Sequence, residues 1–287
     1  MATYEAFYGF REPPFSLTPD PRFLFMTPDQ REALAYLTYG IQERKGFLVL
    51  TGEVGVGKTL IMRTLLGRLD ESVETAIVMN AMLTFKQLLT MALIDFGLPA
   101  PSHGKVEMLI AFQQFLLRLR DAGRNAVLVV DEAQNLSPLS LEEFRLLSNL
   151  ETSSQKLIQI VLVGQPELKV QLNSHRLRQL RQRIPGIWEL RPLAPEGIGE
   201  YIEHRIRIAS EGRAGGIFDE GAVDEVTGYS NGIPRMINML CDRSLLIGYV
   251  QDRKRIGMEI VRAAVRELEQ GFGVRDTCVV PTLGTEP

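Results

Sequence analysis

A glycine-rich octapeptide constrains the fold of this 287-residue chain more than any other feature of its sequence: Gly52-Glu53-Val54-Gly55-Val56-Gly57-Lys58-Thr59. The apolar run 47–50 before it is typical of a short buried strand, and the pattern 60–69 after it is typical of a helix. Glycines allow the backbone to turn successive N–H groups inward, and the following helix adds its positive N-terminal dipole. The sequence therefore predicts a loop that cradles the phosphates of a nucleotide.

Two side chains of this loop predict how ATP is bound. Lys58 places a point charge near the β- and γ-phosphates, and Thr59 offers a hydroxyl to Mg²⁺. ATP and Mg²⁺ are therefore the expected cofactors. The loop residues expected to bind the nucleotide are Gly52, Glu53, Val54, Gly55, Val56, Gly57, Lys58, Thr59 and Leu60.

Further apolar runs after the loop are typical of buried strands, and helical patterns lie between them. Strands are expected at 47–50, 75–79, 126–130, 158–163 and 187–190, and helices at 30–43, 60–69, 85–96, 106–119 and 141–150. Strands that are apolar throughout and separated by helices indicate a parallel sheet covered on both faces. The predicted fold class is α/β, a P-loop nucleotide-binding fold with a five-stranded parallel sheet.

Two other parts of the chain differ from this core. The segment 7–28 alternates aromatic residues with prolines, which predicts an extended strap. After Pro192 only helical patterns remain, and Pro195, Pro234 and Asp219 fit helix starts. We expect a strap at 1–28, a nucleotide-binding domain at 29–191, an all-α lid at 192–270 and a flexible tail at 271–287.

Two adjacent carboxylates follow the apolar run 126–130. Asp131 is the expected Mg²⁺ partner, and it completes the predicted cofactor-binding and metal-binding set with Thr59. Glu132 is the residue expected to polarise the attacking water, because phosphoryl transfer requires positioning, metal support and an oriented nucleophile. The alternative is that the pair only caps the start of a helix. The phosphate loop earlier in the chain favours the catalytic interpretation.

Polar residues elsewhere extend the predicted site. Gln165 follows the strand 158–163, so its amide would contact the γ-phosphate or the attacking water, unless it only starts a turn with Pro166. Asn80 is a weaker candidate of the same kind. Four arginines in the run 176–184 suit stabilisation of charge on a phosphoryl group, within the chain or from a neighbouring subunit. The alternative for any one of them is a solvated surface position.

Composition limits the other classes of function. The formal charge of −3 and the pI near 5.8 give no reason to expect nucleic acid as the main partner. Cys241 and Cys278 supply neither a disulfide framework nor a zinc site, which fits a reducing cytoplasm. No window approaches the roughly 20 apolar residues of a membrane helix. We therefore expect a cytoplasmic protein. If it works at the inner membrane, a partner brings it there.

These elements together resemble an AAA+ ATPase. The resemblance implies that Gln165 is the sensor 1 residue and that Arg235, in Gly232-Ile233-Pro234-Arg235, is the sensor 2 arginine. It also implies that Arg183 is the arginine finger, with Arg178 and Arg181 as alternatives. A strand order of 5-1-4-3-2 and activity as a homo-oligomer follow from the same resemblance. The expected catalytic residues are Glu132, Lys58, Gln165, Arg183 and Arg235.

A narrower resemblance, from about residue 4 to 270, is to the GspA/ExeA-type ATPases. It is carried by 7–10 (FYGF), 14–25 (PFSLTPDPRFLF), 130–136 (VDEAQNL) and 162–168 (LVGQPEL). These bacterial proteins are linked to type II secretion, to mannose-sensitive-haemagglutinin (MshM-like) pilus biogenesis and to exosortase-associated exopolysaccharide loci. The resemblance implies ATP hydrolysis that drives or regulates assembly of an envelope machine, with a protein partner at the inner membrane.

Two features qualify this resemblance. The best-known secretion members continue into a membrane helix and a peptidoglycan-binding domain, and this sequence ends before either, which favours a soluble member or a chain cut after the ATPase region. The TniB-type transposition ATPases have similar cores and bind DNA. A DNA-binding regulator of transposition is therefore the second hypothesis, which the acidic balance does not encourage.

Overall fold

The structure is a computed structural model that describes residues 4–79, 82–99, 104–152 and 155–271. Contacts divide the chain into two compact units. One unit is Pro19–Pro192, and the other joins Met1–Thr18 to Leu193–Pro287. Asn80 and the predicted tail beyond Gly271 lie outside the described residues.

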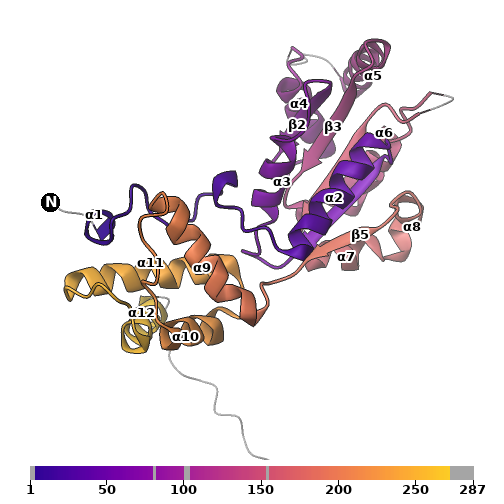
Figure 1. Ribbon diagram of the computed structural model, residues 1–287. Coiled ribbons are helices and arrows are strands. Elements are labelled where there is room, and N and C mark those ends of the chain that lie inside the picture. Colours follow the sequence, from indigo (N-terminus) through magenta and orange to yellow (C-terminus); the bar gives the residue numbers. More distant parts are fainter. Residues whose placement is uncertain (1–3, 80–81, 100–103, 153–154, 272–287) are drawn as a thin grey trace, which may run out of the picture. The chain divides into compact units, whose positions relative to one another are not determined.

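A five-stranded parallel sheet forms the centre of the first unit (Figure 1). Its strands are β1 (Phe47–Gly52), β2 (Val73–Val78), β3 (Asn125–Val130), β4 (Gln159–Gly164) and β5 (Ile187–Leu190). The strand order is β2-β3-β4-β1-β5, which confirms the predicted order read from the other edge. The predicted fold class is therefore confirmed. Because all strands are parallel, their carboxyl ends lie at one edge of the sheet.

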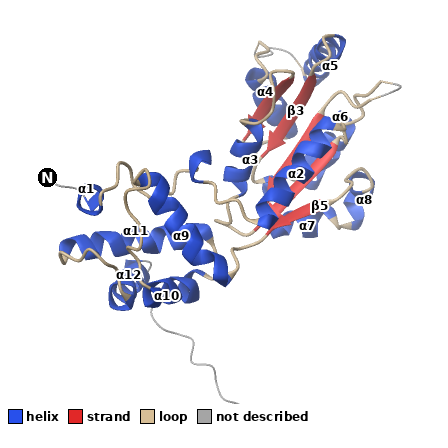
Figure 2. Cartoon of the chain, viewed as in Figure 1, coloured by secondary structure: helices blue, strands red, loops and turns tan. Residues whose placement is uncertain are grey.

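Helices cover both faces of this sheet (Figure 2). They are α2 (Pro28–Gln42), α3 (Lys58–Leu66), α4 (Phe85–Asp95), α5 (Lys105–Asp121), α6 (Pro138–Leu147), α7 (Pro166–Leu172) and α8 (Arg178–Arg181), with 3₁₀ turns η1 (Pro21–Phe23), η2 (Ala133–Asn135) and η3 (His175–Leu177). Successive side chains of a strand point to opposite faces. Leu128 accordingly packs in the cluster with α4, α5 and α6, whereas Val127 packs in the cluster with α2 and α3.

Helix α7 is an element that the sequence reading did not include. Gln165 directly follows β4, as expected, and it is also the N-cap of α7. Pro166 occupies the first helical position, where the missing N–H of proline costs nothing. Leu168 and Leu172 are buried and hold this short helix against the core.

The other unit is helical: α9 (Pro195–Ala209), α10 (Glu220–Ser230), α11 (Pro234–Val250) and α12 (Met258–Gly271). The N-terminal segment adds α1 (Tyr4–Tyr8) to it, a short helix in the proline-free part of a segment that was predicted to be extended. Asp219 caps α10 as predicted, because its side chain accepts a hydrogen bond from the Ala222 N–H. Among the described residues, none of the helices combines the length and the apolar character needed to cross a bilayer.

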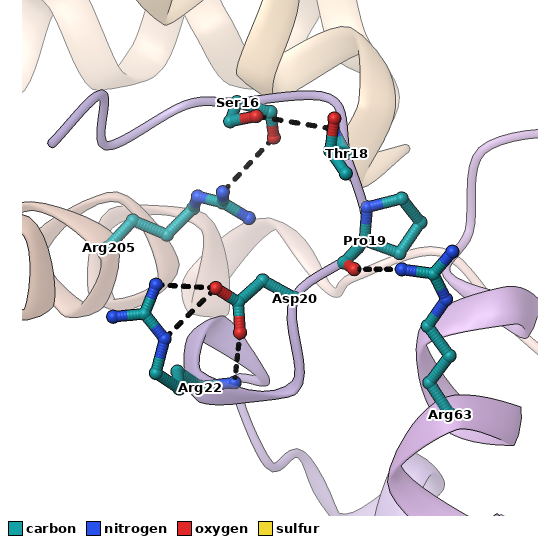
Figure 3. Close-up of polar contacts among 7 residues, drawn as sticks. All are labelled: Ser16, Thr18, Pro19, Asp20, Arg22, Arg63 and Arg205. Atoms are coloured by element: carbon teal, nitrogen blue, oxygen red, sulfur yellow. Dashed lines mark hydrogen bonds and ion pairs between the residues drawn. The ribbon is translucent and has the colours of Figure 1, made fainter.

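The first half of the strap packs within this helical unit. The ring of Phe15 is only 1% exposed and meets Phe218 edge to face, with 6.0 Å between the ring centroids. Arg205 of α9 is also buried, and its guanidinium donates to the carbonyl oxygen of Pro14. It also donates to the carbonyl oxygen of Ser16 (Figure 3). A buried arginine is stable only when its donors are satisfied, so these carbonyls are a structural requirement of the unit.

The second half of the strap belongs to the sheet unit. Arg63 of α3 donates to the Pro19 carbonyl at 2.6 Å, and Asp20 caps η1 while it pairs with Arg22 (Figure 3). Phe23 is 4% exposed and anchors the turn. The strap is therefore divided between the two units at Thr18 and Pro19.

The buried ring of Phe15 generates a stability prediction. Phe15→Ala is expected to destabilise the helical unit by about 3–5 kcal/mol, because it removes a fully buried ring and leaves a cavity. Hydrogen exchange of the amides in α9 and α11 measures the loss. Leu17→Ala is the control, since Leu17 lies in the same segment and is 51% exposed. Equal protection in the two variants would contradict this packing role.

Candidate nucleotide-binding site

The glycine-rich loop lies between the end of β1 and the start of α3. Gly55 and Gly57 have φ angles of 86° and 103°, a region that side-chain-bearing residues rarely adopt. Val56 between them is 1% exposed and anchors the loop in the core. Gly57 is also the N-cap of α3, and no side chain caps that helix. The first N–H groups of α3 are therefore left to an anionic ligand, which is the arrangement predicted for phosphate binding.

Lys58 is folded back over this loop. Its ammonium group donates to the carbonyl oxygens of Gly52 at 2.7 Å and Glu53 at 2.9 Å. The side chain is 7% exposed, and burial lowers the pKa of Lys58, while the carboxylates of Glu132 and Asp131 oppose that shift. The ammonium group therefore lies in a partly desolvated position, where an added anion would interact with it more strongly than in water.

A close approach of two strands fixes the base of the loop. Gly52 pairs with Leu190 of β5, and a Cβ atom at Gly52 would lie 2.6 Å from the Leu190 carbonyl oxygen. Only glycine fits such an approach without a shift of backbone. The first glycine of the motif is therefore required by packing as well as by the turn.

Asp131 follows β3 at the same edge of the sheet. Burial raises the pKa of Asp131, and the Glu132 N–H, Lys58 and the Thr59 side chain act against that rise. The Glu132 N–H donates to Asp131 Oδ1 at 2.9 Å. The Thr59 side chain is close enough to Asp131 to lower the pKa of that carboxyl, so the structure brings together the two residues predicted to hold Mg²⁺. A hydroxyl and a carboxylate are oxygen donors of the kind that Mg²⁺ takes alongside nucleotide phosphates, so these residues fit the ion.

Glu132 is held by side-chain amides. Its backbone is left-handed, with a φ of 53° and a ψ of 37°, which is unfavourable for a residue other than glycine. Its Oε2 accepts a hydrogen bond from Gln134 Nε2 at 2.6 Å and another from Gln165 Nε2 at 3.3 Å. The structure therefore brings Gln165 to Glu132, as expected from residues that follow adjacent strands.

Gln134 is a site residue that the sequence reasoning missed. It lies two positions after Glu132, in a segment whose predictions concerned the two carboxylates and the family resemblance. Its amide contacts both Glu132 and the backbone of Gln165. The signal available in the sequence was weak, because a glutamine after a strand is common at the surface of proteins.

The predicted arginines lie apart from this cluster or in the other unit. Arg183 precedes β5, at the edge where the strands begin, and donates to Ser148 Oγ at 3.1 Å. Arg178 and Arg181 on α8 are exposed. Arg235 is in the first turn of α11 in the helical unit, and it is exposed too. Within the sheet unit, the structure groups Lys58, Thr59, Asp131, Glu132 and Gln165, and it does not bring Arg183 to them.

Two comparisons of the sequence with known proteins find similarity. Residues 41–172 match the family model described as an AAA domain. The chain is 41% identical over 274 residues to general secretion pathway protein A of Aeromonas hydrophila, a match that covers 95% of this chain and 49% of the relative. The chain therefore spans about half the length of that relative.

Solved structures with the same fold include two proteins from archaea. Cdc6p from Pyrobaculum aerophilum matches with a TM-score of 0.68 and 21% identity, over 88% of this chain and 70% of that one. The ORC2 protein of Aeropyrum pernix, solved as ADPNP-ADP complexes, matches with a TM-score of 0.67 and 19% identity, over 90% and 72%. At these identities the likeness shows the fold alone.

The buried ammonium group leads to a binding prediction. Lys58→Ala is expected to weaken ATP binding by about 10- to 100-fold, the loss typical of removing charge-assisted hydrogen bonds. Isothermal titration calorimetry with ATP and Mg²⁺ measures this change. Lys45→Ala is the matched control, because Lys45 is exposed and lies over the Tyr39 ring. Wild-type affinity in the Lys58 variant would rule out the proposed phosphate contact.

Proposed function

We propose, on the premise that this chain carries an AAA domain and is homologous to general secretion pathway protein A, that it is a Mg²⁺-dependent ATPase. The observation that carries the proposal is the cluster at the carboxyl edge of the sheet. Lys58, Asp131 and Glu132 interact electrostatically there, and Gln165 donates to Glu132. This arrangement joins a phosphate-binding loop to a carboxylate suited to act on water.

Each residue has a proposed role in hydrolysis. The loop N–H groups and Lys58 bind the phosphates, and Thr59 with Asp131 would hold Mg²⁺, which neutralises charge on the phosphate oxygens. Glu132 orients the attacking water and accepts its proton. Gln165 contacts the water or the γ-phosphate through its amide. Most of the rate enhancement then comes from positioning and electrostatics, because phosphoryl transfer requires little covalent chemistry from the protein.

Two arginines are proposed to complete the site. Arg183 acts as an arginine finger on the nucleotide of a neighbouring subunit in a homo-oligomer, with Arg178 and Arg181 as the alternatives. Its place at the opposite edge of the sheet from the phosphate loop supports a role in trans. Arg235 reaches the γ-phosphate from the helical unit, which the exposed position of this side chain in α11 permits.

The biological role proposed is to drive or regulate assembly of a bacterial envelope machine for secretion, pilus biogenesis or exopolysaccharide export. The 41% identity to general secretion pathway protein A supports it. In this role the chain acts in the cytoplasm and binds a protein partner at the inner membrane. Recovery of envelope-machine subunits in cross-linked complexes, enriched with ATP, tests the role. ATP-stimulated binding of DNA at low salt would instead favour a transposition regulator.

The role of Glu132 predicts that binding and turnover separate. Glu132→Gln is expected to keep ATP affinity and to lose turnover by about 100-fold or more, because the amide cannot accept the proton of water. Glu107→Gln is the control, since it removes an exposed carboxylate from the first turn of a helix of the same unit, α5. The checks are titration with ATP and a phosphate-release assay. An unchanged turnover rate would remove Glu132 from its assigned role.

The role of Arg183 predicts complementation between subunits. Arg183→Ala alone is expected to lose turnover by about 1,000-fold, as for removal of an arginine finger. Mixing it with Glu132→Gln subunits is expected to restore part of the activity, because a Glu132→Gln subunit donates an intact Arg183 to its neighbour. Arg68→Ala, at an exposed position after α3, is the control. Wild-type turnover in Arg183→Ala would place the finger elsewhere.

A further inference from the structure

Gln134 connects the carboxylate of Glu132 to the end of β4. Its side-chain Nε2 donates to Glu132 Oε2 at 2.6 Å, and its Oε1 accepts the backbone N–H of Gln165 at 3.0 Å. One amide therefore bridges the residues that follow β3 and β4. The bond to the Gln165 N–H has an ordinary length, and the bond to Glu132 is short, as hydrogen bonds to an ionised acceptor tend to be.

This bridge requires an amide of the length of glutamine. An amide donates through nitrogen and accepts through oxygen, whereas a carboxylate only accepts and an ammonium group only donates. The position of Gly164 is consistent with this fit, because a Cβ atom there would lie 2.8 Å from Gln134 Oε1. A side chain at Gly164 would therefore displace the amide from the Gln165 N–H.

The bridge restrains the Glu132 carboxylate, which is the group proposed to act on water. The left-handed backbone of Glu132 sets the direction of its side chain, and amides from Gln134 and Gln165 then hold Oε2. Lys58 and Asp131 are charged groups of this cluster that interact electrostatically with Glu132. With Oε2 engaged twice, Oε1 is the oxygen presented to an attacking water.

We propose that Gln134 is a positioning residue for ATP hydrolysis, which holds the Glu132 carboxylate so that one oxygen is fixed and the other accepts from water. This inference rests on the proposed ATPase function. Gln134 contacts neither nucleotide nor water in this role and acts only through Glu132. Loss of the bridge frees the carboxylate to rotate, and misplacement of a catalytic group by about 1 Å is enough to cost about 100-fold in rate.

Gln134→Met tests the proposal, because methionine has a similar length and cannot form either hydrogen bond. We expect kcat to fall by about 10- to 100-fold and KM to change by less than about threefold, since the phosphate loop is untouched. Gln171→Met is the matched control, because in the described part of the chain the Gln171 amide donates to the Leu136 carbonyl at 2.7 Å and not to Glu132. Unchanged kcat in Gln134→Met would overturn the proposal. A raised kcat would also overturn it, because it would show that Gln134 restrains the carboxylate from reacting.

A second measurement separates positioning from general stability. In a Glu132→Gln background, single-turnover rates with and without Gln134→Met are expected to agree within about twofold, because a residue that acts through Glu132 has no separate effect. Equal losses in both backgrounds would make Gln134 a structural residue and overturn the proposal.

Hydrogen exchange supplies a readout that does not depend on turnover. Gln134→Met is expected to raise the exchange rate of the Gln165 amide, which loses its acceptor, and to leave amides of the central strands unchanged. Unchanged exchange at Gln165 would show that the bridge is absent and would overturn the proposal. If the wild-type chain hydrolysed no ATP while Gln165 lost protection in the variant, the bridge would stand and its role in hydrolysis would be rejected with the ATPase function.

Discussion

The hydrogen-bonded pairing of β1 with its neighbours β4 and β5 is the constraint on which the site depends. Thr51 pairs with Gly164, and Gly52 pairs with Leu190, so the start of the phosphate loop and Gln165 leave the sheet at the same level. The pairing of Val130 with Leu162 brings Asp131 and Glu132 to that level from β3. A shift of register by one residue would turn every strand side chain to the opposite face, so core packing and site geometry specify the same register.

The strands follow from the sequence because their signals are local, whereas their order was expected from the family resemblance alone. β5, at Ile187–Leu190, has the predicted bounds, and the other strands differ from prediction by one or two residues at their ends. Helix α11 also begins at Pro234, the predicted helix start. The loop glycines, Lys58 and the two carboxylates were identifiable because their spacing after apolar runs is itself the signal.

Features that depend on tertiary contacts were outside the reach of such signals. Gln134 has no local mark of function, because its partners Glu132 and Gln165 meet only when β3 and β4 pair. Arg205 reads as the charged face of a helix, yet the fold buries it against the strap carbonyls at Pro14 and Ser16. Gln165 lies far along the chain from Gln134, and the strap carbonyls lie far from Arg205. Residue spacing carries no information about such distant partners.

The two carboxylates of the site differ in the groups that hold them. Both interact with the Lys58 charge, but Asp131 also interacts with a hydroxyl and a backbone N–H, whereas Glu132 takes hydrogen bonds from two neutral amides. Neutral amides fix the direction of the Glu132 carboxylate through hydrogen bonds and add no further positive charge beside it. The proposal that the same chemical group takes a cation at position 131 and water at position 132 is supported by these different partners.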